Sequence, residues 1–233
     1  MVEAVLFDFN GTLYFDSDIN HDSWNEIIDE ISGGRIDFEE FFKIYRSTKD
    51  SIVIKKAFEM IEKEYTEEEV EYFVQKKEQL YRQMGIDKKR TVLPDGAKEF
   101  MDYIQYKGIP MNLATSSIIE NVNFYFEYFK IDRWFDFDKI AYDDGTYINK
   151  VQMYQDCAKR VGAKIENCLV IEDSPTGVYD AIEAGCKGVI IINSSHLEFK
   201  ADKIIQIVDH YNEIDRKILD ESSNWYIWEN NVY

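Results

Sequence analysis

Asp8 is the residue of this 233-residue chain best placed to do chemistry. It follows residues 2–7 (VEAVLF), a largely apolar segment that predicts a buried strand, and Gly11 and Thr12 turn the chain away behind it. An aspartate at the carboxyl end of a first strand can serve as a nucleophile or as a metal ligand. Two places on, where a carboxylate could exchange protons with a substrate, stands Asn10, whose carboxamide does not titrate.

A second pair of carboxylates, Glu172 and Asp173, follows another apolar run at residues 168–171. Because Ser174 and Pro175 come next, this pair is also typical of a helix N-terminus, where acids favour the helix dipole. That explanation would suffice for one isolated pair. Together with Asp8, however, the carboxylates supply the oxygen ligands that Mg²⁺ prefers, and they would repel one another without a cation.

Three further polar residues follow predicted strands or precede a predicted helix. Thr115 and Ser116 end an apolar strand, where their hydroxyl and backbone groups can bind a phosphate, although such a sequence is also typical of an ordinary loop. Lys150 precedes a helix, and a lysine in this setting is commonly a solvated surface charge. Each residue alone is weak evidence for a site.

The elements that must position these residues alternate between strands and helices. Strands are predicted at 109–114, 168–171 and 189–192, and helices at 97–106, from 118 through 129, at 151–161 and at 176–184, with a poorly patterned stretch at 134–141. This alternation predicts an α/β fold whose core is a Rossmann-like doubly wound parallel sheet with right-handed crossovers. In such a sheet the strand ends converge, so Asp8, Thr115 and the Glu172–Asp173 pair should meet at one crevice.

Residues 15–90 change character, because apolar residues recur there at helical spacing and no strand pattern interrupts them. Gly33 and Gly34 separate the first helix from the second, and Thr66 with three following glutamates predicts an N-cap. The sequence therefore predicts two domains: a core made of residues 1–14 and 91–233, and an inserted all-helical cap at 15–90.

Composition excludes several classes of protein. The net charge of −18 argues against nucleic acid and against an anionic membrane as partners, and no apolar run approaches a membrane span. Three cysteines without a C-x-x-C spacing are expected to be buried and reduced. These features predict a cytoplasmic monomer or homodimer. The aromatic segment at 225–233 is expected to fold back on the core, with a dimer contact as the alternative.

Four motifs in this order and spacing resemble one family. They are DFNGTL at 8–13, LATSS at 113–117, Lys150, and VIEDSPTGVYDAIEAG at 170–185. Together they resemble the haloacid dehalogenase superfamily, in its phosphatase and phosphomutase branch with a helical C1-type cap. The resemblance implies a Mg²⁺-dependent phosphatase acting on a small phosphorylated metabolite.

The same resemblance implies a role for each motif residue. Asp8 would form an aspartyl-phosphate, Thr115 with Ser116 would bind the transferring phosphoryl group, and Lys150 would bridge Asp8 and phosphate. Asp173, Asp8 and the backbone carbonyl of Asn10 would hold Mg²⁺. Glu172 would support the metal, directly or through water.

Asn10 stands where sugar-phosphate hydrolases of this family carry an aspartate that acts as acid and base. We rank first a slow or specialised phosphatase, which favours acyl or aryl phosphates and accumulates the aspartyl-phosphate. A phosphate-metabolite binding protein with decayed catalysis ranks second. Behind these stand a deamidated or engineered Asn10, a phosphomutase, and a phosphonate hydrolase that would recruit a cap lysine (Lys49, Lys55 or Lys56).

Residues of the predicted cap are candidates for binding the rest of the substrate. His21 lies near the hinge, one position away from the histidine of phosphomutase-like relatives, and a histidine at the edge of the core is the alternative. Arg35, Arg46 and Lys49 offer positive charge against an acidic background, although each is equally compatible with a surface position.

Overall fold

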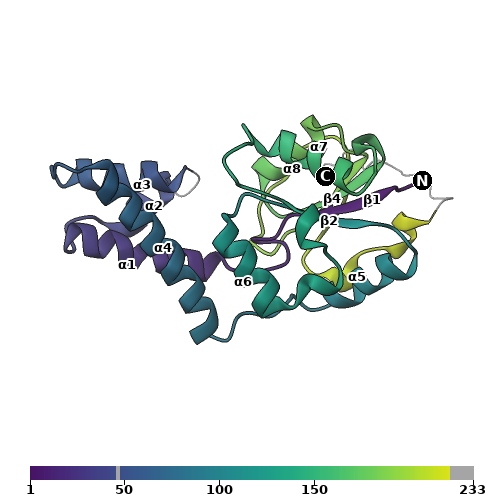
Figure 1. The fold of residues 1–233 in the computed structure, drawn as a ribbon, viewed down its shortest axis with the longest axis horizontal. Helices are drawn as coiled ribbons and strands as arrows, with labels where there is room; N and C mark the ends of the chain where they lie inside the picture. Colours follow the sequence, from purple (N-terminus) through teal and green to yellow (C-terminus); the bar gives the residue numbers. More distant parts are fainter. Residues whose placement is uncertain (46–47, 221–233) are drawn as a thin grey trace, which may run out of the picture. The chain divides into compact units, whose positions relative to one another are not determined.

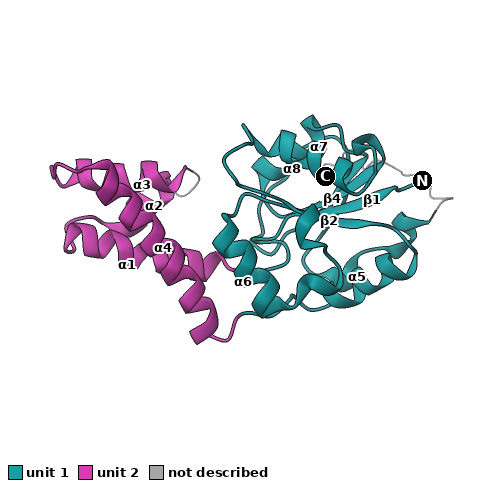
Figure 2. Ribbon diagram, viewed as in Figure 1, with its two compact units in different colours: residues 1–15, 91–233 teal, residues 16–90 magenta. Residues whose placement is uncertain are grey.

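The computed structural model describes residues 1–45 and 48–220 (Figure 1). Arg46 and the aromatic segment at 225–233 lie outside these residues, so their predicted roles stay predictions. The chain forms two compact units, one made of residues 1–15 and 91–233 and the other of residues 16–90 (Figure 2).

The first unit is built on a six-stranded sheet in the order β3-β2-β1-β4-β5-β6. Every neighbouring pair of strands in this sheet is parallel. The strands are β1 (Ala4–Phe7), β2 (Met111–Thr115), β3 (Ala141–Tyr142), β4 (Cys168–Glu172), β5 (Gly188–Ile192) and β6 (Ile204–Val208). All residues of β1 and β4 are buried because helices cover both faces, which explains their continuous apolar sequences. The predicted α/β fold with a parallel sheet is confirmed.

Four helices of this unit connect the strands, and Figure 1 shows α5 and α6 on the opposite side of the sheet from α7 and α8. They are α5 (Ala97–Tyr106), α6 (Ile119–Phe129), α7 (Lys150–Arg160) and α8 (Pro175–Glu183). Short 3-10 turns lie at Ile131–Arg133, Phe137–Lys139, Ile165–Asn167, Tyr211–Glu213 and Arg216–Leu219.

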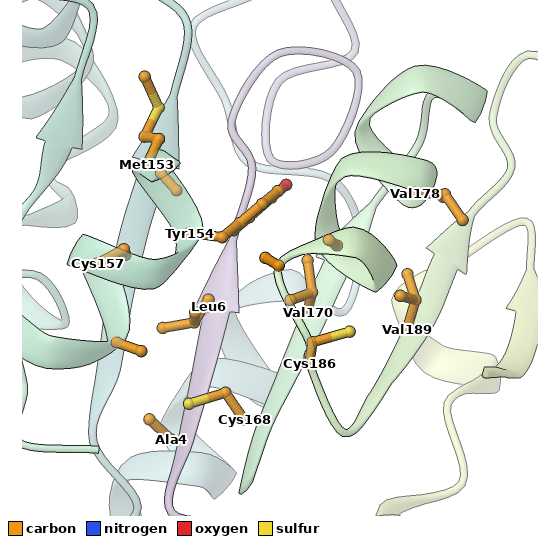
Figure 3. Close-up of a cluster of buried hydrophobic side chains, with 14 of the residues drawn as sticks. Ala4, Leu6, Met153, Tyr154, Cys157, Cys168, Val170, Val178, Cys186 and Val189 are labelled. Atoms are coloured by element: carbon orange, nitrogen blue, oxygen red, sulfur yellow. The ribbon is translucent and has the colours of Figure 1, made fainter. Parts of the chain in front are cut away.

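A core of buried side chains joins α7 and α8 to one face of the sheet (Figure 3). Leu6 of β1 and Val170 of β4 pack there against Met153 and Tyr154 of α7. The three cysteines, Cys157, Cys168 and Cys186, are free thiols buried in this same cluster, as predicted from their number and spacing. Burial of such a cluster fixes α7, and with it the residues at the N-terminus of that helix.

Two strands were not predicted from the sequence. β3 begins at the end of the poorly patterned stretch at 134–141. It contains only two residues, too few to show the alternation of apolar and polar residues that marks a strand. β6 is an edge strand with exposed or half-buried residues in its middle, so it lacks the continuous apolar run that marked the central strands. A continuous apolar pattern does not predict such edge strands, because part of an edge strand is exposed to solvent and carries polar residues.

The second unit consists of four helices among its described residues: α1 (Ser17–Ser32), α2 (Phe38–Tyr45), α3 (Asp50–Met60) and α4 (Glu67–Asp87). Gly33 ends α1 in the left-handed conformation (φ 60°), and its N–H donates to the carbonyl of Asp29. Thr66 caps α4 through a capping box with Glu69, as its sequence predicted. The helical insertion between β1 and β2 is therefore confirmed.

In the part of the chain that the structure describes, no helix combines the length and the apolar character that crossing a membrane requires.

Candidate active site

The turn after β1 holds Asp8 at the end of its strand. The Asp8 N–H donates to the carbonyl of Ile171 in β4 (3.0 Å), which continues the pairing of the two strands to their last residues. The carbonyl of Phe9 then accepts from the N–H groups of Thr12, Leu13 and Tyr14, so the chain reverses tightly. Gly11 adopts a φ of 77° in this turn, and a Cβ there would come within 2.0 Å of Asp173 Oδ2. Glycine is thus required on conformational and on steric grounds.

Lys150 is the cation at the centre of this site. It begins α7, where the side chain of Asn149 caps the helix by accepting from the Gln152 N–H (3.1 Å). The Lys150 Nζ lies 2.6 Å from Asp8 Oδ1 and 2.6 Å from Glu172 Oε1. All three side chains are nearly excluded from solvent, so the lysine links two buried carboxylates.

Glu172 is held by donors on both of its carboxylate oxygens. Oε2 accepts from the backbone N–H groups of Asp173 (2.8 Å) and Ser174 (3.0 Å). Oε1 accepts from the Tyr154 hydroxyl (2.9 Å) in addition to Lys150. A Cβ on Gly177 would lie 1.7 Å from Oε1, so the first turn of α8 leaves room for the carboxylate only because it carries a glycine. Glu172 is therefore fixed in position.

Burial and charge set the ionisation of these groups. Burial raises the pKa of Asp8 to about 7, with a further contribution from the Glu172 carboxylate and against the lowering effect of Lys150. Burial also acts to raise the pKa of Glu172, but Lys150 and the backbone N–H groups hold it below its usual range. Burial alone would lower the pKa of Lys150, and the two carboxylates raise it above its usual range. A second cation beside Asp8 would favour the ionised carboxylate there.

The carboxylates also form the one cluster among the described residues that could hold a metal ion. Asp8, Glu172 and Asp173 each offer an oxygen, and these atoms lie within 4.8 Å of one another. An all-oxygen set of carboxylates fits Mg²⁺. Because both oxygens of Glu172 already accept hydrogen bonds, Asp8 and Asp173 are the better direct ligands. Asp173 Oδ1 is oriented by the hydroxyl of Thr12 (3.3 Å).

The end of β2 and the residues that follow it lie in the same unit, and two of these residues contact Asn10. Thr115 is buried, and its Oγ1 accepts from the Ser117 N–H (3.2 Å), whereas Ser116 is exposed. The Oδ1 of Asn10 accepts from Ser117 Oγ (2.8 Å) and from the Tyr125 hydroxyl (3.1 Å). Neither of these two partners of Asn10 was singled out in the sequence. Ser117 belongs to the LATSS motif, but Tyr125 sits on the apolar face of α6 and carries no signal of its own.

The cap candidates are described within the second unit. The ring of His21 packs edge-on against Phe38 and Phe42, and its Nε2 lies 3.1 Å from Glu39 Oε1. Lys49 is exposed at the N-cap of α3. These contacts lie within the second unit, and a role for His21 and Lys49 toward the substrate stays a prediction.

Comparisons with known proteins agree with this architecture. The family model described as haloacid dehalogenase-like hydrolase matches residues 2–185. A HAD hydrolase, family IA, variant 3, from Entamoeba histolytica HM-1:IMSS is 31% identical, with a TM-score of 0.81 and coverage of 92% of this chain and 96% of that chain. Among curated proteins none matches the chain.

Two more distant structures share the fold. A mutant of CbbY from Rhodobacter sphaeroides is 21% identical, with a TM-score of 0.75 and coverage of 91% of this chain and 96% of that chain. A beta-phosphoglucomutase from Clostridium difficile is 22% identical, with a TM-score of 0.74 and coverage of 95% and 96%. The family model and the Entamoeba relative confirm what the four motifs indicated: the chain belongs to the haloacid dehalogenase-like hydrolases, in family IA with a helical cap.

Proposed function

We propose that this hydrolase is a Mg²⁺-dependent phosphatase that takes a phosphoryl group from a small phosphorylated metabolite onto Asp8. The observation that carries the proposal is the pairing of Lys150 with both Asp8 and Glu172 at 2.6 Å, beside the carboxylate of Asp173. In a chain of net charge −18, an anionic substrate needs local positive charge, which Lys150 would supply together with a metal ion held by the neighbouring carboxylates.

The proposed reaction divides one displacement into two. An oxygen of Asp8 attacks phosphorus, the bond from phosphorus to the leaving oxygen breaks, and that oxygen keeps the electron pair. In the second displacement water attacks phosphorus, the bond to the Asp8 oxygen breaks, and phosphate leaves with the carboxylate restored. Lys150 stabilises negative charge on the transferring group, and Thr115 with Ser116 binds its oxygens. Magnesium held by Asp8, Asp173 and the backbone carbonyl of Asn10 would neutralise further charge on the phosphoryl oxygens. Glu172 keeps Lys150 in place.

Asn10 limits the rate in this proposal. A carboxamide donates a hydrogen bond but neither protonates the leaving alkoxide nor activates water, and loss of such general acid–base catalysis costs on the order of 10² to 10⁴ in rate. We therefore expect slow turnover, a preference for aryl and acyl phosphates, and an aspartyl-phosphate that persists.

A second candidate function, binding of a phosphorylated metabolite without turnover, is favoured by the same Asn10. An aspartate-to-asparagine mutant of the related CbbY was solved in complex with xylulose-(1,5)bisphosphate, so that protein holds a phosphorylated ligand in its mutant form. The two candidates share the site and differ only in whether phosphorus moves to Asp8.

An Mg²⁺-dependent assay on a panel of phosphate esters, run side by side on native and Asn10→Asp protein, separates the candidates. The phosphatase proposal expects weak hydrolysis of aryl phosphates by the native protein and a rise of on the order of 10²-fold or more in the variant. Absence of turnover and of any phosphate adduct after incubation with acetyl phosphate, with phosphate esters still bound, decides for the binding protein.

A further inference from the structure

Two hydroxyl groups gather on the oxygen of the Asn10 carboxamide. Ser117 Oγ donates to Asn10 Oδ1 at 2.8 Å and the Tyr125 hydroxyl donates to the same atom at 3.1 Å. The two hydroxyl oxygens are themselves 2.9 Å apart, so the three side chains form one compact group. The roles proposed for Asp8, Lys150 and Asp173 do not explain why these three side chains meet.

Tyr125 is held rigidly where its hydroxyl meets Asn10. Its side chain is fully buried, and its ring stacks on Phe9 with centroids 3.9 Å apart and planes 18° from parallel. Phe129 packs against the ring edge-on at 6.3 Å. Because Phe9 precedes Asn10 in the chain, the same turn that presents Asn10 also positions the tyrosine. A stacked, buried tyrosine has little freedom to turn its hydroxyl elsewhere.

These contacts decide how the carboxamide is oriented. The group is planar, with an acceptor oxygen at one end and a donor NH₂ at the other. The two hydroxyl donors fix the oxygen toward Ser117 and Tyr125, and the NH₂, at the other end of the planar group, then points away from them. A carboxylate at this position would have no such polarity, because both of its oxygens accept.

We propose that Tyr125 and Ser117 are positioning residues that orient Asn10 as a hydrogen-bond donor to the leaving-group oxygen. This inference rests on the proposed phosphoryl transfer to Asp8. As the bond from phosphorus to the leaving oxygen breaks, that oxygen keeps the electron pair, and the Asn10 N–H donates to it. Water then supplies the proton. Hydrogen bonds to a charged oxygen are stronger than neutral ones, so this donor acts mainly in the transition state.

The role predicts a dependence on the leaving group that a merely structural tyrosine would not produce. Benzyl phosphate, phenyl phosphate and 4-nitrophenyl phosphate have similar shapes and progressively less basic leaving oxygens. Tyr125→Phe keeps the stacked ring and removes the hydroxyl. We expect it to slow transfer from benzyl phosphate about tenfold more than transfer from 4-nitrophenyl phosphate, since one oriented hydrogen bond is at stake.

Controls come from the same helix and the same group. Tyr128→Phe removes the hydroxyl of a more exposed tyrosine that packs on Phe124, and it should leave all three rates unchanged. Ser117→Ala should shift the selectivity in the same direction as Tyr125→Phe. In an Asn10→Ala background Tyr125→Phe should change nothing further, because the residue through which it acts is gone.

The orientation can also be measured without any turnover. In a ¹⁵N-labelled protein, the side-chain NH₂ resonances of Asn10 are identified by their absence in Asn10→Asp. Tyr125→Phe should move them, and Tyr128→Phe should not. Resonances of Asn10 that stay in place in Tyr125→Phe overturn the inference.

Rates of phosphate transfer separate the two proposals. Formation of the Asp8 adduct with equal losses on all three substrates overturns the positioning role and leaves the phosphatase proposal standing. If neither the native protein nor Tyr125→Phe forms an adduct, and Asn10→Asp shows no turnover, the proposed function fails and the inference falls with it.

Discussion

Two buried lysines, one in each unit, are set between pairs of carboxylates and over aromatic rings. Lys150 of the sheet unit lies 2.6 Å from both of its carboxylates and 5.5 Å from the centroid of the Tyr154 ring. Lys77 of the helical unit lies 2.8 Å from Glu78 and 3.4 Å from Asp50, over the rings of Trp24 and Tyr81. The sequence singled out the first lysine and gave no reason to notice the second.

The difference lies in what surrounds each group. Backbone N–H groups just before α8 hold Glu172, and a third carboxylate, Asp173, lies beside the pair. The Lys77 group instead joins α3 to α4, and none of its carboxylates belongs to a metal-ligating cluster in residues 1–45 or 48–220. The same charges therefore join two helices in one unit, and in the other they surround the residues proposed to carry the chemistry.

The largest expected effect tests whether the carboxylate beside Lys150, and not the one beside Lys77, accepts a phosphoryl group. Asp8→Asn should abolish phosphate transfer, a loss on the order of 10³-fold or more, because a carboxamide is no nucleophile. Asp50→Asn makes the same change in the Lys77 group and should still form an adduct. The measurement is intact mass after incubation with acetyl phosphate. An adduct on Asp8→Asn would break the comparison.

The next largest effect tests whether the Lys77 group stabilises the helical unit. Lys77→Met leaves Asp50 and Glu78 without their cation and should lower the free energy of unfolding by about 3 kcal/mol. Denaturant unfolding measures the loss. The matched control is Lys76→Met, since Lys76 pairs with Glu30 on the exposed side of α4 and should matter far less. Equal losses for the two lysines would contradict the assigned role.

Magnesium should stabilise only through the carboxylates at the strand ends. At a Mg²⁺ concentration about 100 times its dissociation constant, binding to the folded state adds about 2.7 kcal/mol. Asp173→Asn should remove this gain, measured as a shift in Tm, and Glu78→Gln should retain it. A gain that survives Asp173→Asn would show that the metal binds elsewhere.

The smallest expected effect is a pH dependence from the cap. Burial, with the neighbouring Glu78, raises the pKa of Asp50 to about 6 against the effect of Lys77. When the pKa of a carboxyl is higher in the folded state than in the unfolded state, the free energy of unfolding of the protein falls as pH rises from about 4 to 6. Relative to Asp50→Asn, the native protein should therefore weaken across this window, by on the order of 1 kcal/mol after solvent screening. If the native protein instead becomes more stable relative to Asp50→Asn as pH rises, the pKa of Asp50 is not raised in the folded state.

Sequence reasoning reached the parts of the site that depend on sheet geometry. Asp8, Thr115 and Glu172 were predicted to converge because each ends a strand, and β1, β2 and β4 are indeed adjacent and parallel. The helix predicted at 97–106 is α5 with the same bounds. The catalytic and binding roles assigned to these residues stay predictions.

Contacts that depend on side-chain packing could not be predicted in this way. Tyr125 reaches Asn10 across 115 positions of sequence and looks like any core residue of an amphipathic helix. Lys77 looks like its more exposed neighbour Lys76, and only the packing of α4 against α1 and α3 buries it. A periodic pattern tells which face is buried, but it does not tell which polar atoms on that face meet.

The ion pair between Asp8 and Lys150 spans 142 positions, and the contact between Thr12 and Asp173 spans 161. During synthesis at 5 to 20 residues per second, roughly 7 to 30 seconds separate the emergence of these partners from the ribosome. Until α7 and β4 follow, the nascent chain carries an aspartate that the finished sheet will bury, with no cation to meet it. Closure of this pair is consequently a late event, and a chain truncated before β4 has no competent site.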